Sequence, residues 1–341
     1  MHHCCWRKAM EWDRGIAVVI PCYKVTRQIL VLLAEIGPEV DRIYCVDDAC
    51  PDGSGDLIER SCSDPRVVVL RNRVNTGVGG AVMHGYRCAV ADGATVIVKL
   101  DGDGQMDPAL IEAFVSPILG ADADYTKGNR FFDLREIKSM PLLRRIGNLG
   151  LSFMAKASTG YWDLFDPTNG YTAIHAEVAR RLPYDSISSR YFFESDILFR
   201  LNVMRAKVLD VPMDARYGDE VSGLKVSKIV GEFLAKHVRN TSKRIVYGYF
   251  LRDMNIASFE LLVAVPMIVF GVAFGLYHWI GSVEGGLITP LGTIMLAALP
   301  LVLGVQLLLA FLSHDTAAMP RHALHRLLLR YPAARPAANG M

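Results

Sequence analysis

Several features that would assign this chain of 341 residues to a common class are missing. No two of its seven cysteines form a C-x-x-C pair and none lies beyond Cys88, which disfavours a zinc site or a disulfide framework and favours reduced thiols. The formal net charge is only +2, so nucleic acid is not an expected partner. The first 14 residues hold no apolar stretch as long as a signal peptide, so we expect the N-terminal part to stay where it is made.

Long apolar runs, by contrast, are present near the C-terminus. Residues 261–280 and 287–312 are each apolar over a length sufficient to cross a bilayer core of about 30 Å. The linker between them carries no lysine or arginine, whereas both outer flanks do. The positive-inside rule therefore predicts a helical hairpin with two transmembrane helices, both termini cytoplasmic and the preceding domain cytoplasmic.

A basic amphipathic pattern precedes the hairpin. Between residues 225 and 252, apolar residues recur at helical spacing while lysine and arginine occupy the remaining positions. This favours a helix that lies on an anionic membrane surface, with an ordinary solvated helix as the alternative. The expected divisions are an N-terminal extension 1–14, a catalytic domain 15–224, juxtamembrane helices 225–255, transmembrane helices 256–313 and a cytosolic tail 314–341.

The region before the hairpin alternates β-rich apolar runs with helical patterns. The expected strands are 16–20, 43–46, 67–70 and 95–100, and the expected helices are 26–36, 54–61 and 79–91. This alternation predicts an α/β fold with a parallel, doubly wound sheet. In such sheets ligands bind beyond the carboxyl ends of the strands.

Residues suited to a nucleotide and a metal follow these strands. Asp47 and Asp48 end the second strand, where they could accept hydrogen bonds from a base or a ribose; turn chemistry is the alternative. A glycine-rich turn from Asn75 to Ala81 opens a helix, but it follows the third strand and lacks the G-x-G-x-x-G spacing, which disfavours an oxidoreductase. After the fourth strand, Asp101 and Asp103 offer the carboxylate oxygens that Mg²⁺ or Mn²⁺ prefers.

Together these motifs resemble the family 2 glycosyltransferases of GT-A fold. The features that carry the resemblance are Val18 to Tyr23, the Asp47-Asp48 pair, the Asn75-to-Ala81 loop and the run Asp101-Gly-Asp103-Gly-Gln105. Within the family the chain is most similar to the polyprenyl-phosphate glycosyltransferases, which include dolichol-phosphate mannosyl synthases and bactoprenol glucosyltransferases. The resemblance covers about residues 15 to 230 and extends to the C-terminal hairpin.

The resemblance implies a role for each matching residue. Those expected to bind the nucleotide-sugar are Pro21, Tyr23, Asp47, Asp48, Asn75, Gly77, Asp101, Gln105, Asp166 and Asn169. Asp103 is implied as the direct ligand of Mg²⁺ or Mn²⁺, with Asp101 close to the metal and the ribose. Asp196 ends an acidic motif that supplies the catalytic aspartate of many relatives. Residues implied at the acceptor phosphate are Arg130, Arg216, Ser222 and Lys225. A solvated helix start competes for Asp196, and a membrane-facing basic patch competes for Arg216 and Lys225.

The implied activity is inverting, metal-dependent transfer of a sugar from GDP-mannose or a UDP-hexose to a polyprenyl phosphate at the cytosolic membrane face. A transferase acting on a glycan or lipid hydroxyl is the alternative, and association with a second copy is left open. A processive polysaccharide synthase is disfavoured because the chain has no Q-x-x-R-W run and too few membrane helices. A catalytically silent membrane scaffold is disfavoured by the intact acidic and glycine motifs.

Overall fold

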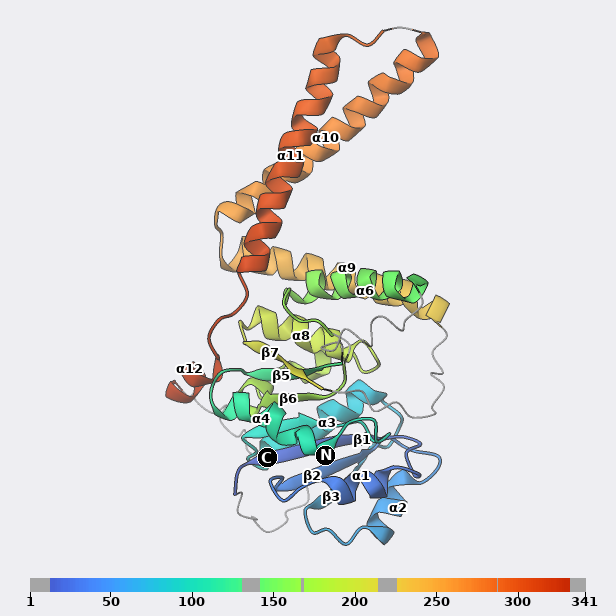
Figure 1. Cartoon of the computed structure of the whole chain (residues 1–341), viewed down its shortest axis with the longest axis vertical. Coiled ribbons are helices and arrows are strands. Elements are labelled where there is room, and N and C mark those ends of the chain that lie inside the picture. The colour runs from blue at the N-terminus through green and yellow to red at the C-terminus, as the bar shows by residue number, and fades with distance from the viewer. Residues whose placement is uncertain (1–12, 131–141, 167–168, 214–225, 287, 332–341) are drawn as a thin grey trace, which may run out of the picture. The chain divides into compact units, whose positions relative to one another are not determined.

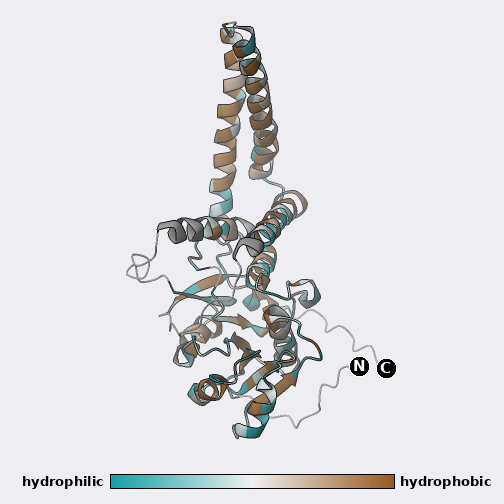
Figure 2. Ribbon diagram, turned by 90° about the vertical axis from the view of Figure 1, so that its right-hand side faces the viewer, coloured by the Kyte–Doolittle hydropathy of each residue, from teal (hydrophilic) through white to brown (hydrophobic). Residues whose placement is uncertain are grey.

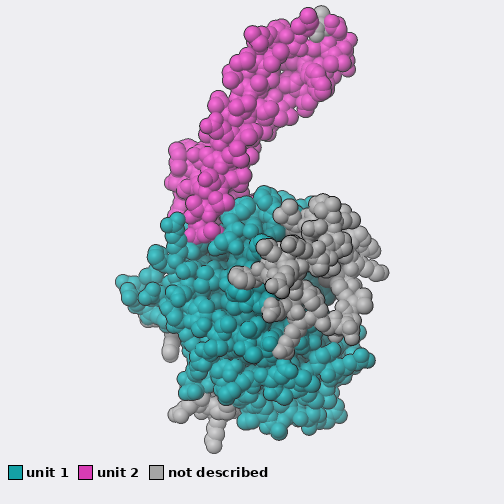
Figure 3. Space-filling model, in the orientation of Figure 1, with its two compact units in different colours: residues 1–240, 320–341 teal, residues 241–319 magenta. Residues whose placement is uncertain are grey.

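The computed structural model describes residues 13–130, 142–166, 169–213, 226–286 and 288–331. The chain divides into two compact units (Figure 3). Unit 1 comprises residues 1–240 together with 320–341, and unit 2 comprises residues 241–319.

Unit 1 is built on a seven-stranded sheet, with the elements labelled in Figure 1. Its strands are β1 Ile16–Cys22, β2 Arg42–Asp47, β3 Val67–Arg71, β4 Val96–Lys99, β5 Tyr125–Asn129, β6 Thr172–His175 and β7 Val208–Pro212. Its helices are α1 Ile29–Glu35, α2 Ser54–Ser61, α3 Val78–Ala91, α4 Ile111–Leu119, α6 Leu142–Thr159, α7 Ala176–Ala179, α8 Phe193–Val203 and α12 His325–Arg330, with short 3-10 turns at Pro108–Leu110 and Tyr184–Ser186. Helix α9, Val226–Ile245, begins in unit 1 and ends in unit 2.

The strand order β3-β2-β1-β4-β6-β5-β7 confirms the predicted α/β architecture. The first four strands are parallel, as predicted. The sheet as a whole is mixed, because β6 runs antiparallel to both β4 and β5. The direction of β6 is not indicated by the sequence, because this strand has only four residues and no alternating pattern.

Alternation along the strands divides the core into two layers, one on each face of the sheet. In β1, Ala17 and Val19 pack with α3, α7 and α8, whereas Val18 and Ile20 pack with α1, α2 and α4. All four side chains are fully buried. Strands covered on both faces are therefore near-continuous apolar runs, which is why β1, β2 and β4 were predictable.

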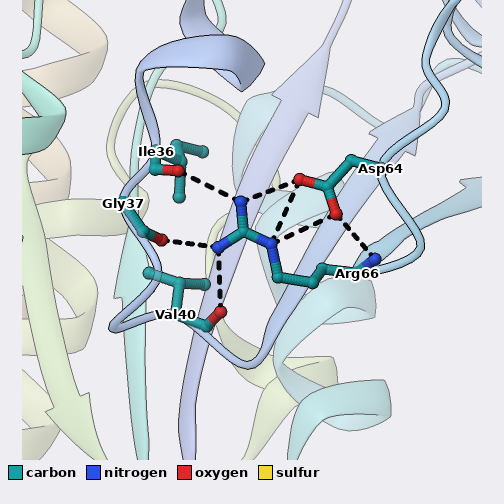
Figure 4. A network of polar contacts seen from close by, with 5 residues as sticks. All are labelled: Ile36, Gly37, Val40, Asp64 and Arg66. Atoms are coloured by element: carbon teal, nitrogen blue, oxygen red, sulfur yellow. Dashed lines mark hydrogen bonds and ion pairs between the residues drawn. The ribbon is translucent and has the colours of Figure 1, made fainter.

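Arg66 joins two loops at the amino ends of the strands (Figure 4). Its guanidinium donates hydrogen bonds to the carbonyl oxygens of Ile36, Gly37 and Val40 and forms an ion pair with Asp64 at 2.8 Å. The hydrogen bond from Arg66 holds the pKa of Asp64 below its usual value. This network fixes the loops that precede β2 and β3, at the edge of the sheet opposite the predicted ligand site.

Unit 2 contains the predicted hairpin. It comprises the end of α9, a π-helix at Val246–Arg252, and the long helices α10 Ile256–Gly285 and α11 Leu291–Ala317. Both long helices are apolar and long enough to cross a membrane, and both are largely brown in Figure 2. Their packing is close, since a Cβ added at Gly271 would lie 2.8 Å from the Ala297 carbonyl oxygen. Small residues at such a crossing are typical of helices packed in a bilayer.

Residues 320–331 of the expected cytosolic tail belong to unit 1. Asp124, which is fully buried, accepts hydrogen bonds from the backbone N–H groups of Leu324 and His325 at 2.7 and 2.8 Å. The His325 ring also contacts Asp124 through Nδ1 at 2.7 Å and stacks on His175. The chain therefore leaves unit 1, forms the hairpin and returns to unit 1.

Candidate active site

The carboxyl ends of β1, β2 and β4 lie side by side. Cys22 pairs with Asp47 across β1 and β2, and Val19 pairs with Lys99 across β1 and β4. Motifs that are far apart in the sequence thus begin at one edge of the sheet. This is the edge at which the sequence predicts a ligand site.

The acidic loop after β4 is tightly seated. A Cβ added at Gly102 would lie 3.2 Å from the Pro21 carbonyl oxygen, so the loop packs directly on the end of β1. Asp103 accepts a hydrogen bond from the Gln105 backbone N–H at 3.0 Å, which shapes the turn. The loop that carries Asp103 and Gln105 thus lies against Pro21, and the binding of a donor or metal by these residues stays a prediction.

Asp101 is paired with a buried lysine. The ammonium of Lys99, whose side chain is 2% exposed, lies 2.6 Å from Asp101 Oδ1 and 3.7 Å from Glu194 Oε1. Burial alone would lower the pKa of Lys99, but the charges of Asp101 and Glu194 raise it above its usual value. Burial conversely raises the pKa of Glu194. A buried lysine ammonium therefore lies against Asp101.

Sequence reasoning singled out neither Lys99 nor Lys127. Lys127 on β5 is also fully buried, and it donates a hydrogen bond to the Asn169 carbonyl oxygen. Burial lowers its pKa. A lysine within a short buried strand was the available signal, because an unpaired ammonium is rarely tolerated in a core.

Asp47 and Asp48 both accept hydrogen bonds from backbone N–H groups of neighbouring loops. Asp47 accepts hydrogen bonds from the N–H groups of Cys50 and Gly55 at 2.8 and 2.7 Å, which fixes the turn into α2. Asp48 accepts from the N–H groups of Thr76 and Gly77 at 2.9 and 2.7 Å, and from the side chains of Thr76 and Asn72. These contacts fit the turn-chemistry alternative, while their binding of a base or ribose stays a prediction.

The glycine-rich loop is closed against the segment before α8. Gly77 has φ +86°, and a Cβ there would lie 2.6 Å from the Ser189 carbonyl oxygen. The N–H groups of Gly77 and Gly80 bond to Asp48 and to the Ser189 carbonyl, respectively. Asn75 is exposed. Two of the backbone N–H groups available for a phosphate are thus already directed at protein acceptors.

Tyr23 and Arg130 present side chains at the rim. Tyr23 is 44% exposed, as a platform for a base requires, and Lys24 lies over its ring. Arg130 forms a two-bond ion pair with the buried Asp166, at 2.8 and 3.2 Å. This ion pair fixes Asp166, while the Asn169 side-chain oxygen accepts a hydrogen bond from the Tyr171 N–H at 2.9 Å. The predicted acceptor residues Arg216, Ser222 and Lys225 lie outside the described residues.

The two acids of the α8 motif have different neighbours. Asp196 is buried and accepts a hydrogen bond from the Ser188 N–H at 2.9 Å, with Asn240 and Arg200 also in contact. Glu194 instead lies beside Lys99. Asp196 therefore has a structural set of partners, and its predicted catalytic role stays a prediction.

The carboxylates at this edge suit a hard divalent cation whose other ligands come from a bound substrate. Among the described residues, no three His, Cys, Asp or Glu side chains gather into a complete metal cage. Mg²⁺ and Mn²⁺ are commonly held by one or two carboxylates together with substrate phosphates. Asp103, with Asp101 beside it, provides that number of carboxylates.

Comparison with known proteins shows the family of the chain. The model of glycosyl transferase family 2 matches residues 17–182. The undecaprenyl-phosphate mannosyltransferase of Micrococcus luteus is 30% identical over 203 residues, which is 58% of this chain and 82% of that protein. The chain belongs to glycosyl transferase family 2. The predicted resemblance and enzyme class are thus confirmed.

Other relatives agree with this assignment. A UDP-N-acetylglucosamine–dolichyl-phosphate N-acetylglucosaminyltransferase of Methanococcus voltae is 27% identical over 60% of this glycosyltransferase and 87% of its own length. The crystal structure of glucosyl-3-phosphoglycerate synthase from Mycobacterium tuberculosis, with Mn²⁺, UDP-glucose and phosphoglyceric acid, has a TM-score of 0.50 at 19% identity. It covers 68% of this chain and 79% of that one. This likeness confirms the GT-A fold.

Proposed function

We propose that this family 2 glycosyltransferase transfers a sugar from a nucleotide-sugar to a polyprenyl phosphate at the cytosolic membrane face, with Mg²⁺ or Mn²⁺ held at Asp103. The observation that carries the donor half is the Asp101–Asp103 loop, seated on Pro21 where the strands of the sheet end. A metal bound there would neutralise charge on the diphosphate leaving group. UDP-glucose and Mn²⁺ in the M. tuberculosis synthase are consistent with this.

The acceptor half rests on two observations. Relatives that match most of their length to this chain are named for undecaprenyl phosphate and dolichyl phosphate. The chain also carries two helices long and apolar enough to cross a membrane, which suits an enzyme whose acceptor is a lipid.

A single displacement inverts the anomeric carbon. A phosphate oxygen of the acceptor forms the new bond to that carbon while the bond to the nucleoside diphosphate breaks, and the diphosphate leaves with the bonding electrons. An acceptor phosphate is already anionic, so Asp196 need not remove a proton, in agreement with its structural partners. Arg130, held by Asp166 at the rim, would orient a phosphate.

The proposed orientation follows from the path of the chain. Residues before and after the hairpin belong to unit 1, where Asp124 bonds to His325. Both flanks of the hairpin therefore belong to one unit, which supports a paired crossing of the membrane. The lysine and arginine residues of these flanks favour the cytosolic face for both.

The proposal is tested with membranes that contain the full chain, labelled GDP-mannose or UDP-hexoses, and undecaprenyl or dolichyl phosphate. We expect label in the lipid phase only with a divalent cation, and a loss of at least about 100-fold for Asp103→Asn. An Asp103→Asn enzyme that turns over normally would refute the metal assignment.

The product distinguishes the two acceptor classes. A sugar joined to a phosphate is released by mild acid, whereas a glycoside of a hydroxyl resists it. Acid-stable labelled lipid would support the hydroxyl alternative and overturn the polyprenyl phosphate.

A further inference from the structure

Lys99 and Lys127 occupy equivalent positions on one face of the sheet. Each pairs in register with Thr172 of the strand between them, Lys99 from β4 and Lys127 from β5. Residues in register on adjacent strands point to the same face. Two fully buried ammonium groups thus lie beneath the site.

Each lysine reaches a different loop of the candidate site. Lys99 contacts Asp101 at 2.6 Å, and Lys127 donates to the Asn169 carbonyl oxygen. Glu194 of α8 interacts electrostatically with both lysines. Removing one partner from a buried ionic cluster leaves an uncompensated charge, so each charged group here depends on the others.

Gly170 closes the cluster from above. A Cβ added there would lie 2.5 Å from the Lys99 ammonium and 2.6 Å from Asp101 Oδ2. Gly170 therefore packs directly on the Lys99–Asp101 pair. The Lys99 side chain is 2% exposed, whereas that of Asp101 is 30% exposed and can meet a ligand.

We propose that Lys99 is a positioning residue for the donor, acting through Asp101. Its ammonium compensates the charge of Asp101 from inside the protein, so a nucleoside diphosphate can approach the acidic loop with less repulsion. Asp103 lies two residues further along, where its hydrogen bond comes from the Gln105 N–H. This inference rests on the proposed function, in which Asp103 binds the metal. It gives Asp101 a different role, which is to meet the diphosphate with its charge compensated by Lys99.

A double-mutant cycle tests the proposal on the purified full chain. Binding of GDP and UDP with Mn²⁺ is measured by calorimetry for the unaltered chain, Lys99→Met, Asp101→Asn and the double variant. We expect Lys99→Met to weaken diphosphate binding about tenfold when Asp101 is present and less than about threefold in the Asp101→Asn background. Binding of Mn²⁺ alone should not weaken in Lys99→Met, because a nearby positive charge has been removed.

Lys207→Met is the matched control, since Lys207 is only partly buried and lies outside the cluster. If Lys99→Met is not recovered folded, Lys99→Gln replaces it in the same cycle, because glutamine keeps a hydrogen-bond donor without the charge.

Equal losses in both backgrounds, or no loss, would overturn the role of Lys99 through Asp101. A weaker affinity for Mn²⁺ alone in Lys99→Met would also overturn it. Failure of the unaltered chain to bind either diphosphate would overturn the proposed function itself, and with it this inference.

Discussion

Two buried histidines of unit 1 are kept neutral by their surroundings. His175 accepts a hydrogen bond from the Glu177 N–H at 3.1 Å, at the start of α7. His237 lies 2.7 Å from the Ser158 hydroxyl and packs edge-on against Phe192. Burial lowers the pKa of each imidazole to about 4.

These histidines make unit 1 less stable in mild acid. Their pKa values in the folded state lie below the unfolded value of about 6.5, so the unfolded chain takes up protons first as pH falls. Stability is full above about pH 6.5 and is lost toward pH 4. From pH 7.5 to 5.5 we expect each histidine to cost about 1 kcal/mol of unfolding free energy, measured by urea denaturation.

The variants His175→Asn and His237→Gln keep a hydrogen-bonding side chain but do not titrate. Each should reduce the pH dependence by about 1 kcal/mol, whereas His322→Asn, at an exposed position, should leave it unchanged. A pH dependence unaltered in both buried variants would contradict the assignment.

At the scale of elements, Asp48 links the end of β2 to the start of α3. Its carboxylate accepts four hydrogen bonds from the segment Asn72 to Gly77. Asp48→Asn replaces one acceptor oxygen with an amide NH₂ group, which donates hydrogen bonds and cannot accept them. We therefore expect a loss of about 2 kcal/mol in unfolding free energy and a higher KM for the donor, because the glycine-rich loop loosens.

Asp52→Asn serves as the control, because Asp52 is exposed in the turn that follows the same strand. Thermal denaturation and donor titration should show no change for it. Equal effects of the two substitutions would mean that Asp48 contributes through general charge and not through its bonds to the loop.

Strong local patterns explain what the sequence predicts at this scale. The strands β1, β2 and β4 are buried on both faces, and a parallel sheet places their carboxyl ends at one edge, so the position of Asp47, Asp101 and Asp103 at that edge was predictable. Their roles there stay predictions. The direction of β6 depends on long-range pairing and leaves no local trace. The same holds for Glu194 beside Lys99 and for Asn240 beside Asp196, which come from elements far along the chain.

At the scale of the whole molecule, each unit is held by a buried aspartate and its hydrogen-bond donors. In unit 2, Arg244 binds Asp315 through two bonds at 2.6 and 2.9 Å, and the Tyr249 hydroxyl adds a third at 2.8 Å. This ties the segment before the hairpin to the end of α11. In unit 1 the corresponding pair is Asp124 with His325.

The segment after the hairpin should therefore stabilise the domain that precedes it. Burial acts to raise the pKa of Asp124, but hydrogen bonds from His325, Leu324 and Lys207 hold it below its usual value. A chain that ends at Met319 keeps both apolar helices and loses two of these partners. We expect unit 1 to lose about 3 kcal/mol of unfolding free energy, because a buried carboxylate is left short of donors.

A chain that ends at Tyr331 retains α12 and is the matched control. Limited proteolysis of membranes should cut unit 1 of the Met319 variant faster than that of the control, while carbonate extraction should leave both in the membrane, because both keep the two long apolar helices. The point variant Asp124→Asn should behave like the Met319 variant, since it removes the charge to which His325 bonds. Equal protease resistance of all three chains would show that the return of residues 320–331 adds nothing to the stability of unit 1. Greater sensitivity in both altered chains would establish that the segments on either side of the hairpin fold as one body.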